Sequence, residues 1–137
     1  AEALLLGWRA AEPERANAAH ILGRFYFRHN EPTKALPHLG AARHLMPGNI
    51  QYVYDYYNTQ LFLAGDNRKA LAIIAPEFQR MFKPHKTRPV PFRYLAAKFH
   101  FVTGDFQQAM QFVAPIAGKK DRKVDILYLA LLDTGDP

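Results

Sequence analysis

One stretch of this chain returns at a near-constant spacing. Residues 65–76 are echoed by residues 104–115, with glycine, aspartate, two alanines and proline at matching places and apolar residues in the same slots between them. A third copy begins at Asn30, and a fourth begins at Gly135. Self-similarity at a fixed period of this length is typical of repeat architectures, in which each unit buries its apolar face against its neighbours.

The clearest unit, residues 16–49, indicates the type of repeat. It contains, in order, Leu22, Gly23, Tyr26, Ala35, Leu39, Ala42 and Pro47. This set resembles the signature of the tetratricopeptide repeat (TPR) family, with Ala19 where the family has its tryptophan. The spacing of 35 between Ala35 and Ala70 is close to the family period of about 34 residues. The resemblance implies an all-α fold, a right-handed superhelical TPR solenoid of antiparallel helix pairs, with about seven helices. The alternative is another solenoid of helical pairs.

In the TPR frame, the whole chain is a single fragment of an array. Its expected parts are the second half of a repeat at 1–15, repeats at 16–50, 51–89 and 90–120, and the first half of a repeat at 121–137. About three repeats are needed for stability. We therefore expect this fragment to fold, and we expect the parent chain to have further repeats on both sides. The apolar faces of the two end helices should then be exposed.

Glycine, proline and short polar residues predict where the helices begin and end. An Asn or Asp just after a turn glycine suits a helix N-cap. Pro76 and Pro115 should each end or kink a second helix, and Pro37 should distort one, because proline removes a backbone donor and clashes with the preceding turn. The basic, proline-rich linker at 83–91 lengthens one repeat. It is either a tolerated surface insertion or a projecting element that contacts a partner.

The net charge of +6 is concentrated in one stretch. Residues 78–104 contain six basic residues and no acidic ones, while the remainder of the chain holds 12 of each. The candidate basic patch in this stretch comprises Arg80, Lys83, Lys86, Arg88 and Arg93. Such a patch is either a solvated face or a docking surface for an acidic protein, an anionic polymer or a phosphate backbone.

The composition argues against catalysis. The chain has no Cys and no Ser, so the common nucleophilic triads lack an attacking group, and neither standard glycine-rich phosphate loop is present. Its six His are never spaced i, i+4, as a zinc-binding helix face requires. We therefore expect no enzyme activity, no catalytic residues, no cofactor and no metal. No apolar run approaches the about 20 residues that a membrane helix needs.

The TPR resemblance also implies a binding surface, because in that family the first helix of each repeat lines a concave groove. Carried over to this sequence, the candidate partner-binding groove comprises His20, Arg24, Phe27, Arg28, Tyr52, Asp55, Thr59, Phe62, Tyr94, Lys98 and Phe101. The four members between 20 and 28 recur at spacings that share one helix face. Tyr and Arg are enriched at interface hot spots. The set lacks most residues of the clamp by which chaperone-type TPRs hold a C-terminal carboxylate.

Two functions fit these features. The first is a non-catalytic protein–protein interaction scaffold that recruits a partner with an acidic surface. The alternative is direct binding of an anionic polymer, polysaccharide or nucleic acid, through the basic patch; nucleic acid fits less well because no recognisable domain motif is present. In style, the chain also resembles the long periplasmic TPR arrays of Gram-negative exopolysaccharide exporters. That resemblance implies a periplasmic place in a secretion or biofilm complex at the outer membrane, with a polysaccharide-modifying enzyme as partner.

Overall fold

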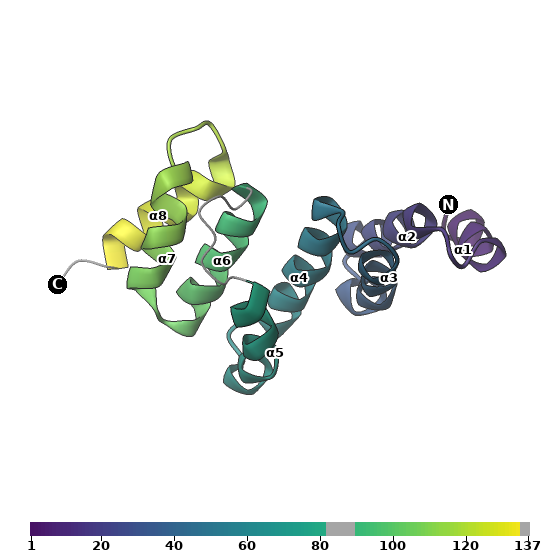
Figure 1. The fold of residues 1–137 in the computed structure, drawn as a ribbon, viewed down its shortest axis with the longest axis horizontal. Coiled ribbons are helices and arrows are strands. Elements are labelled where there is room, and N and C mark those ends of the chain that lie inside the picture. The colour runs from purple at the N-terminus through teal and green to yellow at the C-terminus, as the bar shows by residue number, and fades with distance from the viewer. Residues whose placement is uncertain (82–89, 135–137) are drawn as a thin grey trace. The chain divides into compact units, whose positions relative to one another are not determined.

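The computed structural model describes residues 1–81 and 90–134. Within these residues the chain forms eight α-helices, one short 3₁₀ helix and no strand, so the all-α prediction is confirmed for this part of the chain (Figure 1). The α-helices in the described ranges number one more than the seven or so expected. The linker at 83–91 lies largely outside the described residues, as does Gly135.

Contacts between helices divide the chain into two compact units, Ala1–Leu63 (unit 1) and Ala64–Pro137 (unit 2). The division falls in the last turn of α4 (Ile50–Ala64). It therefore passes through the repeat expected at 51–89. The repeat boundaries and the solenoid arrangement stay predictions, and each unit is described by itself below.

Unit 1 is built around the pair of helices α2 and α3. Its helices are α1 (Glu2–Ala11), α2 (Ala16–Arg28), α3 (Pro32–Leu45) and nearly all of α4. The core between α2 and α3 contains Leu22, Tyr26, Ala35 and Leu39. A Cβ atom placed on Gly23 would stand 2.6 Å from the side chain of Leu39. Gly23 therefore lies where α2 approaches α3 closely.

Aromatic residues of α4 pack on α3. The Arg43 guanidinium lies over the ring of Tyr56, at 4.5 Å from its centroid, and donates a 3.2 Å hydrogen bond to the hydroxyl of Tyr57. A Cβ on Gly40 would stand 3.1 Å from the Tyr56 ring. These contacts place α4 against the α2–α3 pair, and a cation over an aromatic face is attractive in its own right.

Unit 2 has a core formed by its last three α-helices and a short 3₁₀ helix. Its helices are α5 (Arg68–Met81), α6 (Val90–Thr103), α7 (Phe106–Val113), the 3₁₀ helix η1 (Ala114–Ile116) and α8 (Arg122–Thr134). The core contains Ala97, Ala109, Val113, Ile116, Val124, Leu127 and Leu131. Alanines on α6 and α7 allow these two helices to approach closely, and the larger side chains of α8 fill the remaining space.

The repeated glycine slot has a common backbone geometry. Asn30, Gly65 and Gly104 have φ values of 61°, 54° and 89°. This left-handed conformation ends a helix and suits glycine first and asparagine next. A polar side chain then caps the helix that follows: Asn67 Oδ1 accepts from the backbone N–H of Ala70 at 3.2 Å, and Asp105 Oδ1 accepts from that of Gln108 at 3.1 Å. The N-cap expectation is confirmed at Asp105, directly after Gly104, whereas after Gly65 the cap is Asn67, one residue later than Asp66.

The three prolines expected to disturb helices have different outcomes. α7 ends at Val113, and η1 with Pro115 follows, so this proline ends its helix as expected. Pro76 lies inside α5, which continues to Met81, so of the two expected outcomes, an end or a kink, the end does not occur here. Pro37 lies inside α3. Such a helix loses one backbone hydrogen bond at the proline. Its other hydrogen bonds and packing contacts are enough for the helix to continue past that point.

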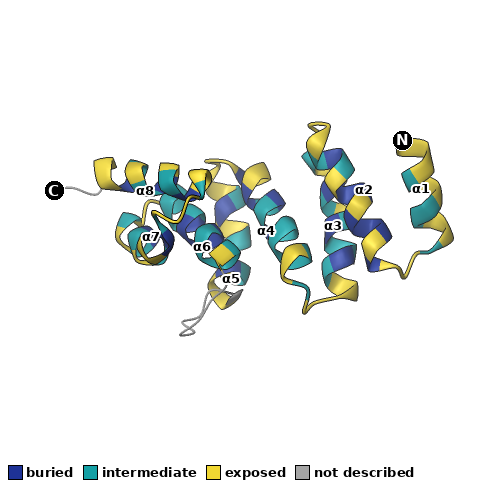
Figure 2. Ribbon diagram, turned by 90° about the horizontal axis from the view of Figure 1, so that it is seen from above, coloured by how far each residue is buried: buried dark blue, intermediate teal, exposed yellow. Residues whose placement is uncertain are grey.

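The two end helices expose apolar side chains, as expected. α1 has no buried residue, and Leu4 is 80% exposed (Figure 2). On α8, Ile126, Leu129 and Leu132 are exposed and follow one another at three-residue steps, which puts them close to one face. None of the helices in the described ranges has the length and apolarity needed to cross a membrane.

Candidate docking surface

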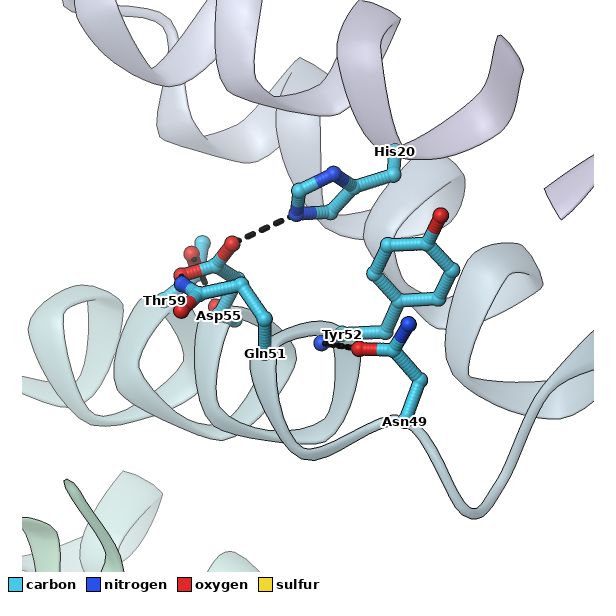
Figure 3. A network of polar contacts seen from close by, with 6 residues as sticks. All are labelled: His20, Asn49, Gln51, Tyr52, Asp55 and Thr59. Carbon is cyan, nitrogen blue, oxygen red and sulfur yellow. Dashed lines mark hydrogen bonds and ion pairs between the residues drawn. The ribbon is translucent and has the colours of Figure 1, made fainter. Parts of the chain in front are cut away.

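The N-terminal half of α4 presents polar side chains toward α2. Asn49 precedes α4, and its side-chain oxygen accepts a 3.1 Å hydrogen bond from the backbone N–H of Tyr52, which satisfies one free donor of the first helical turn. Tyr52, Asp55 and Thr59 then recur at steps of three and four residues, so they share a face. On α2, His20 points at this face (Figure 3).

His20 and Asp55 form the centre of a polar network. His20 Nε2 lies 2.6 Å from Asp55 Oδ2, and because a carboxylate only accepts, the imidazole nitrogen is the donor. The other carboxylate oxygen, Oδ1, accepts a 2.8 Å hydrogen bond from Gln51 Nε2. Thr59 Oγ1 donates to the backbone oxygen of Asp55 at 2.7 Å. Both carboxylate oxygens of Asp55 are therefore engaged within unit 1 (Figure 3).

The His20 ring is held in place by packing as well as by its hydrogen bond. His20 is only 6% exposed, and its ring centroid lies 4.4 Å from that of Tyr52. Thr59 is 2% exposed. The predicted groove residues His20, Tyr52, Asp55 and Thr59 thus lie together, but largely as an internal network between two helices.

Two contacts between α2 and α4 have the same sequence offset. His20 and Asp55 are 35 residues apart. Phe27 and Phe62 are also 35 apart, and their ring centroids lie 5.6 Å from each other in an edge-to-face arrangement. The offset equals the spacing between Ala35 and Ala70. Pairing each residue of α2 with the residue 35 positions later predicts the His20–Asp55 contact from the sequence.

Beside this network, unit 1 has a hollow of about 280 Å³. Its lining residues are Arg24, Phe27, Arg28, Leu39, Asp55, Asn58 and Thr59. Five of the seven belong to the predicted groove. The predicted groove did not include the other two, Leu39 on α3 and Asn58, which lies beside Thr59 on α4. Arg24 and Arg28 are exposed, and neither forms an ion pair with any residue in the described ranges.

The predicted groove residues of unit 2 lie on α6, and they differ in their contacts. Phe101 packs against the core and against the ring of Phe106, with centroids 5.6 Å apart. Lys98 Nζ lies 5.3 Å from the centroid of the Tyr94 ring, and Lys123 Nζ of α8 lies 5.1 Å from the same centroid. The pKa of Lys98 is lowered, first by burial of the side chain and second by the nearby charge of Lys123. Each of these disfavours the charged form of Lys98.

The predicted basic patch is described only at its two ends. Arg80 is exposed at the end of α5. Arg93 instead donates hydrogen bonds to the backbone oxygens of Phe112 and Gln111, at 3.1 and 3.2 Å, and so stabilises the C-terminal end of α7. Lys83, Lys86 and Arg88 lie outside the described residues.

Among the described side chains, no three His, Asp or Glu residues come together as a metal site requires. Searches of protein-family models, of curated proteins and of solved structures each found no match to this chain.

Proposed function

We propose that this chain is a non-catalytic protein–protein interaction scaffold, a TPR-like array that docks a segment of a partner on the surface formed by α2 and α4. The observation that carries the proposal is the hollow of unit 1, which combines two exposed arginines with an apolar floor. Arginine and aromatic residues around a recess are the features of an interface anchor site. The sequence predicts this surface independently of the structure, from the TPR frame.

The repeat register supports the TPR part of the proposal. In a stack of helical pairs, successive first helices lie side by side, and residues one period apart meet. The two contacts at an offset of 35, His20 with Asp55 and Phe27 with Phe62, have this property. A right-handed superhelical solenoid of such pairs is the arrangement that we propose for the array.

The charge of the chain indicates the kind of partner. A net charge of +6 attracts an acidic surface over several ångströms and speeds its association. We propose a partner protein with such a surface, within a larger complex. Exopolysaccharide secretion in the periplasm, with a polysaccharide-modifying enzyme as partner, is the context we propose from the resemblance to exporter arrays.

Replacing Phe62 with alanine is expected to weaken partner docking without unfolding unit 1, because Phe62 is 59% exposed and lies against Phe27 beside the hollow. Peptides selected from a random phage-displayed library on the wild-type protein are the probes. Their Kd, measured by fluorescence polarisation, should rise about tenfold or more, as for an aromatic anchor. The matched control is Ile73→Ala on α5, where the apolar side chain is 79% exposed.

Ile73→Ala should leave the affinities unchanged. A selection that enriches no peptide, or enriched peptides that bind Phe62→Ala and the wild type equally, would contradict docking on this surface. Thermal melts of both variants check that they remain folded.

One observation favours the anionic polymer as a second candidate function: Lys98 and Lys123 place two cations around Tyr94. Exchanging both lysines for glutamine is expected to weaken binding of polygalacturonate, a polyanionic sugar, and to flatten the dependence of its affinity on salt, because fewer counterions are released. Titration calorimetry at several salt concentrations measures both quantities. Unchanged affinity and slope would remove this candidate from unit 2.

A further inference from the structure

The hollow of unit 1 contains an unusual arrangement of charge. Arg24 and Arg28 are one helical turn apart on α2, and both are exposed. Asp55 is the one acid among the described residues that line the hollow. An aspartate beside two arginines would ordinarily neutralise them by forming hydrogen-bonded ion pairs. No such ion pair forms within the described part of unit 1.

His20 accounts for this arrangement. It engages Asp55 Oδ2 at 2.6 Å, while Gln51 engages Oδ1 at 2.8 Å. Because His20 is buried and packed on the ring of Tyr52, its position is set by the fold. The carboxylate is therefore turned toward His20 on α2, and each of its oxygens already accepts a hydrogen bond from a donor other than the arginines.

The hollow consequently offers positive charge at its rim and the apolar ring of Phe27, with Leu39 buried beneath it. Its volume of about 280 Å³ is near the lower limit for ligand pockets, roughly 300 Å³. It is suited to one or two side chains and is too small for a folded element. A carboxylate on a short aliphatic stem, as in glutamate, complements both parts.

We propose that this hollow is a subsite for an acidic side chain of the docked partner, and that His20 is the positioning residue that keeps Asp55 from neutralising Arg24 and Arg28. The proposal rests on the proposed docking function. It adds the chemistry of the recognised group, a carboxylate presented by a side chain. It also explains why a buried imidazole faces an acid at the edge of a cationic recess.

The test compares two synthetic peptide pools that are acetylated and amidated, so that their termini carry no charge. Fixed glutamates alternate with random positions in the first pool, and glutamines replace them in the second. Immobilised wild-type protein should retain the glutamate pool at least about tenfold better, as expected for a desolvated charge pair. The double variant Arg24→Gln/Arg28→Gln should lose this preference. Arg68→Gln, an exposed cation on α5, is the matched control and should keep it.

The role of His20 is tested by the preference for glutamate over glutamine. His20→Leu should reduce this ratio, because Asp55 is then released toward the arginines. The double variant His20→Leu/Asp55→Asn should restore it, since no acid remains to compete. A purely structural role of His20 would instead lower retention of both pools equally, with no recovery in the double variant. Asp55→Asn alone, which keeps His20, should leave the ratio at or above that of the wild type.

The outcomes separate this proposal from the docking function. Equal retention of the two pools, or retention of neither, overturns the acidic subsite, and the docking function still stands if library peptides depend on Phe62. A third pool, with glutamine and a free C-terminus, distinguishes a terminal carboxylate from a side-chain one. Retention of that pool alone would also overturn the proposal.

Discussion

Replacing Gly23 with leucine is expected to destabilise unit 1 by about 1–3 kcal/mol, the usual cost of overpacking a well-filled core. The new Cβ alone would stand 2.6 Å from Cγ and Cδ2 of Leu39 and 3.2 Å from its backbone nitrogen. Leu39 is 1% exposed, so its side chain has little room to move away. Even Gly23→Ala should be destabilising, although alanine in a helix interior is normally favoured over glycine by roughly 0.5–1 kcal/mol.

Gly7 provides the matched control, because it lies within α1 and a Cβ placed on it would meet no atom within 4 Å beyond its chain neighbours and the backbone of its own helix. Gly7→Ala should therefore stabilise the protein slightly, while Gly23→Ala destabilises it. Urea denaturation followed by circular dichroism gives both free energies of unfolding. If the two alanine variants shift stability in the same direction, the close approach of α2 and α3 at Gly23 is not as tight as described.

Replacing Leu131 with alanine is expected to cost unit 2 about 2–5 kcal/mol, the range for a buried leucine whose removal leaves a cavity. Leu131 is fully buried in the core of this unit, where Ala97, Val113 and Val124 are also buried. Leu129, on the same helix, is 63% exposed. Leu129→Ala should change stability by no more than about 0.5 kcal/mol, as is usual for a surface position.

The comparison uses one substitution at two positions of α8, so differences in helix propensity largely cancel. Thermal and urea melts of the two variants measure the difference. Equal costs would mean that α8 is not packed by the face that carries Leu131. A large cost at Leu129 alone would mean that the exposed stripe with Ile126 and Leu132 is covered by another surface in solution.

Several local features of the fold could be predicted because they depend on neighbours in the chain. The left-handed turns at Asn30, Gly65 and Gly104 were signalled by residue type, since few side chains tolerate a positive φ. The cap at Asp105 follows from the same logic. The end of α7 before Pro115 was predicted, but the continuation of α5 past Pro76 was not. Proline disfavours a helix locally, and packing along the rest of the helix decides whether it continues.

The candidate site was predicted in part. The face shared by Arg24, Phe27 and Arg28 follows from helical periodicity, and all three line the hollow. Leu39 was missed because it lies on a different helix, where only the packing of α3 against α2 brings it to the same place. The sequence predicts one basic patch, yet Arg93 is used within unit 2 to hold the end of α7. Charge counted along the sequence does not reveal which cations are already engaged.

The sequence by itself determined the helical character of this protein, its period and the positions of its turns, because backbone preference and apolar spacing act over a few residues. The tertiary structure alone decided that His20 and Gln51 meet the carboxylate of Asp55, and that no ion pair joins Asp55 to Arg24 or Arg28 within the described residues. Hydrogen bonds are short and directional. Whether two side chains on different helices can form one depends on helix separation and rotation to within about an ångström. Packing of the whole unit sets both quantities, and no local pattern in the sequence specifies them.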